Sequence, residues 1–153
     1  MESGCVAVSG ARAVALLPIL HDAEEDDRRI LAALADPACQ AYAMLVSGEP
    51  VGAAVVRWSA PEVLYLAVAA EHRGRGFGRG ILTALQAELP AHGRRLRVGT
   101  ANCALDNIAF YQRCGFRMLA VERDHFAYIQ PPIIENGIVM RDMIVFSYDL
   151  EAS

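Results

Sequence analysis

Glycine and arginine alternate through one short segment of the chain. Arginines occupy positions 73, 75 and 79, and glycines occupy positions 74, 76, 78 and 80. Glycine lets successive backbone amides come close to an anion, and the first turn of a following helix adds unsatisfied N–H donors and the positive end of the helix dipole. The segment follows an apolar run and opens an amphipathic helical pattern. It therefore predicts a phosphate-binding turn whose guanidinium groups supply fixed positive charge.

These residues do not match two other phosphate-binding motifs. The dinucleotide fingerprint Gly-x-Gly-x-x-Gly ends on Arg79 when it is counted from Gly74, and on Ile81 when it is counted from Gly76. A P-loop requires Gly-Lys-Ser/Thr, which the sequence lacks. A solvated arginine turn that only caps a helix is the remaining alternative, although tight turns rarely need this many glycines.

Apolar periodicity and turn residues predict the elements that must hold this segment. Helices are expected over residues 10–17, 26–35, 78–89 and 106–114, and strands over residues 40–46, 51–58, 63–68, 95–101, 116–121 and 141–148. Residues 47–50 join the first two strands in a hairpin, and residues 122–137 form a polar loop that contains prolines. This order predicts an α+β fold with a mixed sheet.

Length and composition predict one domain over residues 1–153, because 153 residues with 54% hydrophobic content can bury a sizeable core. A net charge of −4 argues against a broad nucleic-acid-binding face. No export signal and no run of about 18 apolar residues is evident, so a cytoplasmic protein without a membrane span is expected. Cys5, Cys39, Cys103 and Cys114 lack metal-ligand spacing, so isolated thiols and no bound metal are expected, with Cys114 buried.

Two segments resemble motifs of the GNAT superfamily of N-acetyltransferases. Arg73-x-x-Gly76-x-Gly78, after a strand and before a helix, resembles the family's pyrophosphate-binding motif. The segment Phe110-Tyr-Gln-Arg-Cys-Gly-Phe116 resembles the family's tyrosine, three residues, then glycine-phenylalanine. The resemblance covers roughly residues 40 to 121. It implies a GNAT-type α+β domain, with a mostly antiparallel sheet flanked by helices, that uses acetyl-CoA as co-substrate and no metal.

The resemblance also implies where the donor binds. Backbone groups of Leu66, Ala67 and Val68 would pair with the pantetheine arm of the donor like an added strand. The pyrophosphate would be held by the amides and side chains of Arg73, Gly74, Arg75, Gly76, Phe77, Gly78 and Arg79. Arg79 is equally compatible with a solvated surface position.

One position departs from the family pattern. Many members carry an asparagine seven residues before the motif tyrosine, where it contacts pantetheine, and here that position is Ala104. Asn102, at the end of the preceding strand, is the preferred substitute. Asn107 is the alternative, and it is also compatible with a polar residue in the first turn of the helix.

Tyr111 is the residue that the resemblance assigns to catalysis, because the family tyrosine protonates or hydrogen-bonds the departing thiolate of coenzyme A. A phenol with a pKa of about 10 is roughly 2 kcal/mol too weak an acid to protonate a thiolate of pKa about 8.5 completely. A role while the intermediate collapses is therefore expected. The alternative is a core tyrosine on an amphipathic helix.

The resemblance implies that the acceptor is an amine, from a small molecule or a peptide. A lysine-like amine with a pKa of about 10.4 is almost fully protonated at pH 7, so it needs a base or desolvation. The candidate bases are Glu62, Glu71, Asp124, His125 and Glu135. Phe126 and Tyr128 of the late loop either line an acceptor pocket or fold that loop on itself.

The prediction from these features is an acetyl-CoA-dependent N-acetyltransferase that acts by direct attack in a ternary complex. A homodimer is compatible with the family resemblance. Two alternatives remain open at this stage. One is a non-catalytic acyl-CoA-binding or regulatory module on the same fold. The other is a nucleotide-binding module that uses the glycine turn for another phosphate ligand.

Overall fold

The structure, a computed structural model, describes residues 2–151. The chain divides into two compact units, residues 1–93 and residues 94–153. Each unit has its own antiparallel strands and its own buried apolar residues. The single domain expected from length stays a prediction.

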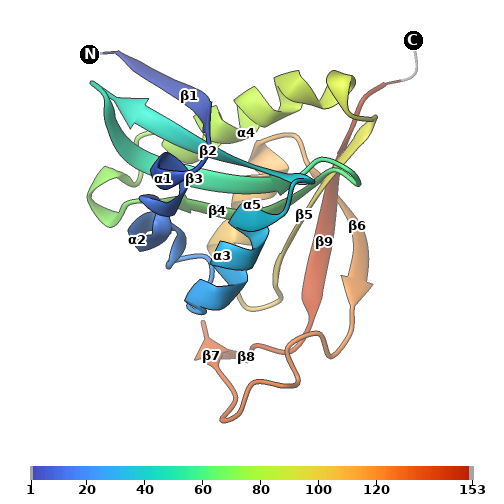
Figure 1. The fold of residues 1–153 in the computed structure, drawn as a ribbon. Coiled ribbons are helices and arrows are strands. Elements are labelled where there is room, and N and C mark those ends of the chain that lie inside the picture. Colours follow the sequence, from blue (N-terminus) through green and yellow to red (C-terminus); the bar gives the residue numbers. More distant parts are fainter. Residues whose placement is uncertain (1, 152–153) are drawn as a thin grey trace. The chain divides into compact units, whose positions relative to one another are not determined.

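Four antiparallel strands form the sheet of the first unit (Figure 1). They are β1 (Ser3–Val8), β2 (Cys39–Val46), β3 (Glu49–Arg57) and β4 (Glu62–Val68). The hairpin expected at residues 47–50 joins β2 to β3, with positive φ at both Ser47 and Gly48. Strand β1 was not predicted, because its small residues carry little strand preference and pairing with β2 stabilises it.

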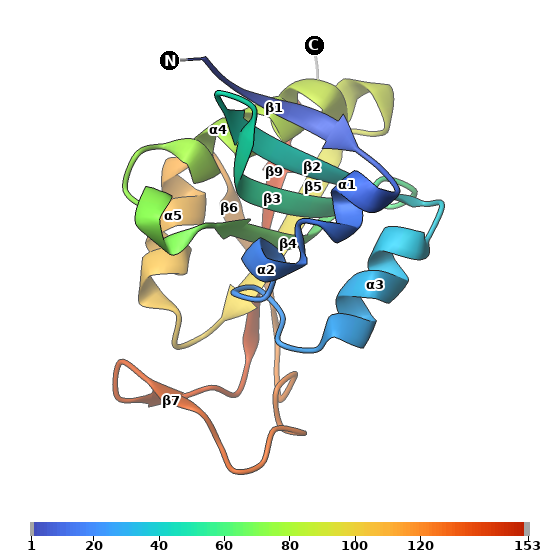
Figure 2. The same ribbon diagram turned by 60° about the vertical axis from the view of Figure 1, so that its left-hand side comes forward.

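Helices cover both faces of these four strands (Figure 2). One face carries α1 (Ala11–Val14), α2 (Leu17–Leu20) and α3 (Asp27–Ala35), and the other carries α4 (Phe77–Glu88). The single helix predicted for residues 10–17 is wrong, because the chain breaks after α1 and restarts with Pro18 in the first turn of α2. The helix predicted from residue 26 is confirmed, and the Asp26 side chain caps it by accepting a 3.0 Å hydrogen bond from the Arg28 amide.

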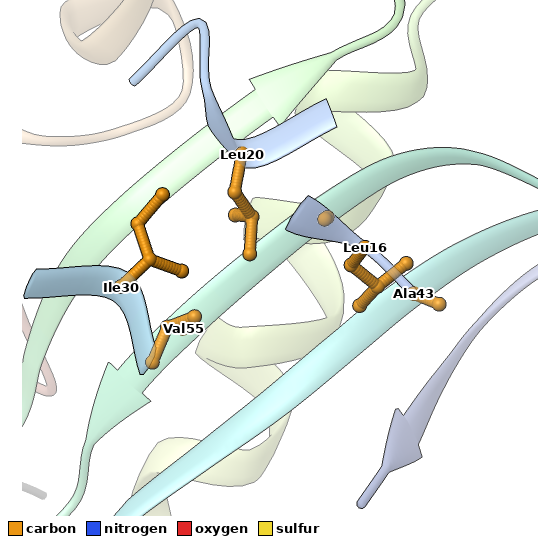
Figure 3. Packing of buried hydrophobic residues seen from close by; sticks show 6 residues of the cluster. Leu16, Leu20, Ile30, Ala43 and Val55 are labelled. Carbon is orange, nitrogen blue, oxygen red and sulfur yellow. The ribbon is translucent and has the colours of Figure 1, made fainter. Parts of the chain in front are cut away.

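Successive side chains of β2 and β3 point to opposite faces of the sheet, so each strand contributes to both packed faces. Leu16, Leu20 and Ile30 of the helical layer are buried against Ala43 and Val55 of the strands (Figure 3). Fully burying each large aliphatic side chain contributes about 1.5–3 kcal/mol. This face therefore holds α1 to α3 against the sheet.

The opposite face of the same strands receives α4 tightly. A Cβ atom at Gly52 would lie 3.1 Å from Ile81 Cδ1, and one at Gly80 would lie 2.9 Å from Met44 Cε. Small residues at these two positions therefore let the helix approach the sheet closely.

In the second unit, β9 (Met143–Asp149) lies between β5 (Arg95–Ala101) and β6 (Arg117–Glu122), antiparallel to both. Helix α5 (Leu105–Arg113) connects β5 to β6. Its Tyr111 packs against Phe116 and Phe146, with ring centroids 5.9 and 5.8 Å away. These aromatic contacts anchor α5 in the unit.

The polar loop expected over residues 122–137 contains β7 (Ile134–Glu135), which forms a small hairpin with β8 (Ile138–Val139) just after it. Asn136 and Gly137 form its turn with φ values of 55° and 73°. An Asn-Gly pair between apolar residues is a strong hairpin signal. The sequence therefore contained a signal for this element, which the prediction missed.

The α+β class is confirmed, and every strand pair described within the two units is antiparallel. All four cysteines are free thiols. The expected burial of Cys114 is wrong, because Cys114 is half-buried and Cys103 is the buried thiol. Across residues 2–151, none of the helices combines the length and the apolar character that a membrane crossing requires.

Candidate functional site

The glycine turn of the first unit has the backbone of an anion-binding site. Gly74 and Gly76 have φ values of 76° and 84°, a conformation that side chains other than glycine rarely adopt. Gly76 is the N-cap of α4, and the first hydrogen bond of the helix runs from the Gly80 amide to the Gly76 carbonyl over 2.9 Å. The amides of Phe77, Gly78 and Arg79 therefore have no acceptor within this helix. A Cβ at Gly74 or Gly76 would meet no atom within 4 Å, so open space borders the turn.

The Arg73 side chain stabilises the turn through two hydrogen bonds. Its Nε donates to the Val68 carbonyl over 3.1 Å, and its Nη2 lies 2.5 Å from Asp22 Oδ2. These bonds connect the turn to the end of β4 and to the segment after α2. The guanidinium groups of Arg75 and Arg79 are exposed. Arg73 thus positions the turn, while Arg75 and Arg79 add positive charge at its surface.

The far end of α4 is fixed by a polar network. Tyr42 of β2 donates its hydroxyl hydrogen to Glu88 and accepts a 2.9 Å hydrogen bond from Trp58 Nε1. His92 stacks on Trp58 with ring centroids 4.2 Å apart. Burial, followed by the Glu88 carboxylate, raises the pKa of Tyr42 above its ordinary range. The sequence does not reveal this anchor, because its residues are far apart in the chain and form no local pattern.

Strand β4 carries the residues predicted to bind pantetheine. Leu66, Ala67 and Val68 pair with β3 in regular antiparallel register. Just before them, Leu64 is an extra residue, because Val55 pairs with Tyr65 and Val56 pairs with Val63. A bulge of this kind bends a strand and increases its local twist. The predicted donor strand ends at Val68, and the glycine turn follows it in the same unit.

Asn102 in the second unit connects the end of β5 to the segment before β9. Its Nδ2 donates to the Val139 carbonyl over 3.0 Å, and its Oδ1 accepts from the amides of Arg141 and Asp142 over 2.9 and 3.0 Å. Its own amide donates to the Asp142 carbonyl over 2.9 Å. The side chain predicted to contact pantetheine therefore satisfies most of its hydrogen-bonding capacity inside the protein.

Asn107 lies in the first half of α5 and points back to β5. Its Nδ2 donates to Thr100 Oγ1 over 3.2 Å, and Thr100 is buried. This bond connects the helix to the strand that precedes it. Neither asparagine occupies the position of the family's contact residue, which remains Ala104 at the N-cap of α5.

Tyr111 is only 7% exposed, within a cluster of Phe110, Phe116 and Phe146. Burial, with a smaller contribution from Cys114, raises the pKa of Tyr111 to about 12. The hydroxyl therefore keeps its proton throughout the physiological range. It can donate a hydrogen bond to a developing anion, but it is a weaker acid than a free phenol.

The candidate bases have different surroundings. Glu62 pairs with Arg57 over 3.4 Å, and Glu71 is exposed in the turn η1 (Ala70–His72). His125 pairs with Glu122 over 2.9 Å at the surface. Asp124 is exposed, and its amide donates to Asp142 Oδ1 over 2.9 Å.

Glu135 belongs to the hairpin that contacts the start of α5. Its Oε2 lies 3.9 Å from the Cys103 thiol, and the neighbouring Asn136 Nδ2 donates to the Cys103 carbonyl over 2.9 Å. Burial and then the Glu135 carboxylate raise the pKa of Cys103. The hairpin therefore covers the β5–α5 junction, and sequence analysis missed this contact.

The described residues offer no set of ligands for a metal ion. Within residues 2–151, no three or more histidine, cysteine or acidic side chains are grouped to hold a metal ion.

Comparison with known proteins assigns the family. A model of the acetyltransferase (GNAT) family matches residues 13–116, which include both the glycine turn and Tyr111. The chain belongs to the GNAT acetyltransferase family. A curated relative, the uncharacterized N-acetyltransferase YvbK of Bacillus subtilis (strain 168), is 33% identical over 91 residues. That match spans 58% of this chain and 59% of the relative, so it covers less than two thirds of the relative's length.

Solved structures of other GNAT proteins share the fold of this chain. A Bacillus subtilis acetyltransferase in complex with CoA superposes with a TM-score of 0.89 at 23% identity, covering 98% of this chain and all of that chain. A GNAT family acetyltransferase from Elizabethkingia anophelis with acetyl-CoA bound gives a TM-score of 0.87 at 24% identity, covering 97% of this chain and 98% of that chain. The predicted GNAT-type fold is confirmed.

Proposed function

We propose that this GNAT protein is an acetyl-CoA-dependent N-acetyltransferase that transfers an acetyl group to a primary amine by direct attack in a ternary complex. The observation that carries the proposal is the open glycine turn at the start of α4, with two positive-φ glycines and amides that the helix leaves unsatisfied. Membership in the family supports it, as do the CoA and acetyl-CoA complexes of the two structural relatives. A homodimer and a cytoplasmic location stay predictions from the sequence.

The donor would use backbone groups more than side chains. The amides of Phe77, Gly78 and Arg79 and the helix dipole suit the pyrophosphate. Backbone groups of Leu66 to Val68 would pair with the amides of pantetheine, as in strand addition, while the Val68 carbonyl also accepts a hydrogen bond from Arg73. Arg73 would act mainly by holding the turn in shape, because its guanidinium group already contacts Val68 and Asp22.

In the reaction, the lone pair of the amine nitrogen attacks the thioester carbonyl carbon, a C–N bond forms, and the C–S bond breaks. The thiolate that leaves takes up a proton, and the amine nitrogen loses one. Tyr111 would donate its hydroxyl hydrogen bond to the developing thiolate. Its raised pKa favours stabilisation by hydrogen bonding over complete proton transfer.

The amine must be neutral before it attacks. Glu62 is the candidate base of the first unit, and its carboxylate lies 3.4 Å from Arg57 Nη1. Glu135 is the candidate of the second unit. A rate-against-pH profile of Glu62→Gln that overlays the profile of the unmodified protein would remove Glu62 from this role.

A non-catalytic acyl-CoA-binding module is the second candidate, and the burial of Tyr111 among three aromatic rings favours it. Incubation with acetyl-CoA and a panel of amines separates the two functions. Release of free CoA thiol that depends on an amine, with the acetylated amine seen by mass spectrometry, is the result expected of the enzyme. Donor binding without any acetylated product would favour the module.

A further inference from the structure

A pocket of about 350 Å³ opens on the first unit, away from the glycine turn. Its walls come from α3, β2, the end of β3 and the middle of β4. Arg29 and Arg57 line it from different elements, and Leu64 and Tyr65 line it from β4. This volume is in the range of small-molecule sites. The pocket therefore has room for a small ligand with one charged end.

Donors dominate the polar groups of this pocket. Each guanidinium presents five N–H donors in a planar fork that matches a carboxylate. Arg57 Nη1 lies 3.4 Å from Glu62, which leaves other nitrogens of the same group for a ligand. Burial and then Glu24 raise the pKa of Tyr65, so its hydroxyl stays protonated and can donate.

The one carboxylate in the lining is already engaged. Asp36 Oδ1 accepts a 2.8 Å hydrogen bond from the Ala38 amide at the end of α3. Other acidic groups act on the lining residues: Glu62 pairs with Arg57, Glu24 and Asp26 raise the pKa of Tyr65, and Asp26 also interacts with Arg29. The arginines therefore suit an anionic end of a ligand, and the flanking acids suit an amine end.

The pocket also lies beside the predicted donor strand. Leu64 and Tyr65 immediately precede Leu66 to Val68 on β4. A strand rises about 3.3 Å per residue, so the pocket and the start of the donor-binding segment are within the length of a small molecule. Leu64 is also the bulged residue that bends the strand at this point.

We infer that the acceptor of this enzyme is an amine that also bears a carboxylate, as an amino acid does, and that Arg29 and Arg57 bind the carboxylate. This inference rests on the proposed N-acetyltransferase function. The carboxylate lies between the two guanidinium groups, the apolar wall of Leu64 contacts the body of the ligand, and the amine points along β4 toward the thioester. A carboxamide of the same ligand has the same shape but lacks the negative charge.

Matched acceptor pairs test the inference. A panel of α- and ω-amino acids is compared with the carboxamide of each, and kcat/KM is measured with saturating acetyl-CoA. For the preferred acceptor, the free acid is expected to exceed its amide roughly 10- to 100-fold. Arg29→Gln and Arg57→Gln each bring this ratio close to one. Because the ratio compares two acceptors in one variant, a general loss of catalysis cancels.

Arg28→Gln is the matched control. Arg28 precedes Arg29 in the same helix, its side chain is 92% exposed, and it does not line the pocket. It is expected to keep the ratio of the unmodified protein. Acetylation of amines with no preference for the acids overturns this inference and leaves the proposed function in place. Failure to bind acetyl-CoA or to acetylate any amine overturns the proposed function, and this inference with it.

Discussion

Tyr111 packs among aromatic residues and is also the residue proposed to donate a hydrogen bond to the leaving thiolate. Its ring contacts three aromatic neighbours, and its hydroxyl keeps the proton because burial raises the pKa to about 12. The family motif predicted the position of this tyrosine. The motif could not predict its burial, because Phe146 joins the cluster from a strand 35 residues later in the chain.

Tyr111→Phe is expected to lower kcat by about 10² or more while acetyl-CoA affinity changes little. The substitution keeps the ring contacts and removes only the hydroxyl that is proposed to donate to the thiolate. Steady-state kinetics and calorimetric binding on the same preparation measure both effects. Unchanged turnover would assign Tyr111 to packing alone.

Asn102 makes contacts within the protein that the sequence did not predict. Its side chain makes three hydrogen bonds to the segment before β9, so structural support explains its position without a ligand. The end of a strand was visible in the sequence. The hydrogen-bonding partners of the Asn102 side chain lie about 40 residues away, so the sequence did not reveal them.

Asn102→Ala is therefore expected to lower the free energy of unfolding by about 2 kcal/mol, because two amides and a carbonyl lose their partner. Urea denaturation measures this change in the free energy of unfolding. Acetyl-CoA affinity is expected to stay within about threefold, since a single neutral hydrogen bond contributes little net free energy. A large loss of affinity with unchanged stability would instead support the pantetheine contact predicted from the sequence.

At the scale of elements, the glycine turn joins β4 to α4 with backbone angles that only glycine adopts easily. The order strand, turn, helix followed from periodicity and from glycine density. The bounds of α3, α4, α5 and β5 differ by at most one residue from those expected. Strand β1 was missed because pairing with β2 rather than local preference stabilises it. The β7–β8 hairpin was missed although its Asn136-Gly137 turn is a local signal.

Gly76→Ala is expected to weaken acetyl-CoA binding about tenfold or more, because a φ of 84° is strained for alanine and relief of the strain displaces the amides of the turn. Titration calorimetry measures the effect. Gly48→Ala is the control. Gly48 has a φ of 83° and equally open surroundings, but it lies in the β2–β3 hairpin.

Both alanine variants are expected to lose about 1–2 kcal/mol of stability from the strained backbone. Only Gly76→Ala is expected to lose donor affinity as well. Equal donor affinity in the two variants would show that the geometry of the turn is not used for binding.

At the scale of the whole molecule, buried hydroxyl and thiol groups make stability depend on alkaline pH. The pKa of Tyr111 is about 12 in the folded state and about 10 in the unfolded chain. The folded state thus holds a proton that the unfolded state loses first. Cys5, with a pKa raised to about 11 by burial and then Glu88, acts in the same direction.

The free energy of unfolding is therefore expected to be unaffected by Tyr111 below about pH 10, and to fall by up to about 1.4 kcal/mol per pH unit as the pH rises toward 12. Urea titrations at several pH values measure this dependence. Tyr111→Phe is expected to have a shallower decline over the same interval. An identical decline in both proteins would contradict the burial of an ionisable Tyr111.

Composition and charge correctly indicated a chain able to bury a large core, and the two motifs indicated the family. Neither could show that the chain forms two compact units, because that division depends on contacts that no local pattern records. The pocket beside β4 was hidden for the same reason. Its arginines come from a helix and a strand that only the fold brings together.

The proposed function depends on binding of an acetyl-CoA donor by the glycine turn and β4. Isothermal titration of the unmodified protein with acetyl-CoA, coenzyme A, ATP and NAD tests it most directly. Micromolar binding of acetyl-CoA and coenzyme A is expected, with much weaker binding of ATP and NAD. No binding of either CoA ligand, or a preference for ATP or NAD, would contradict it.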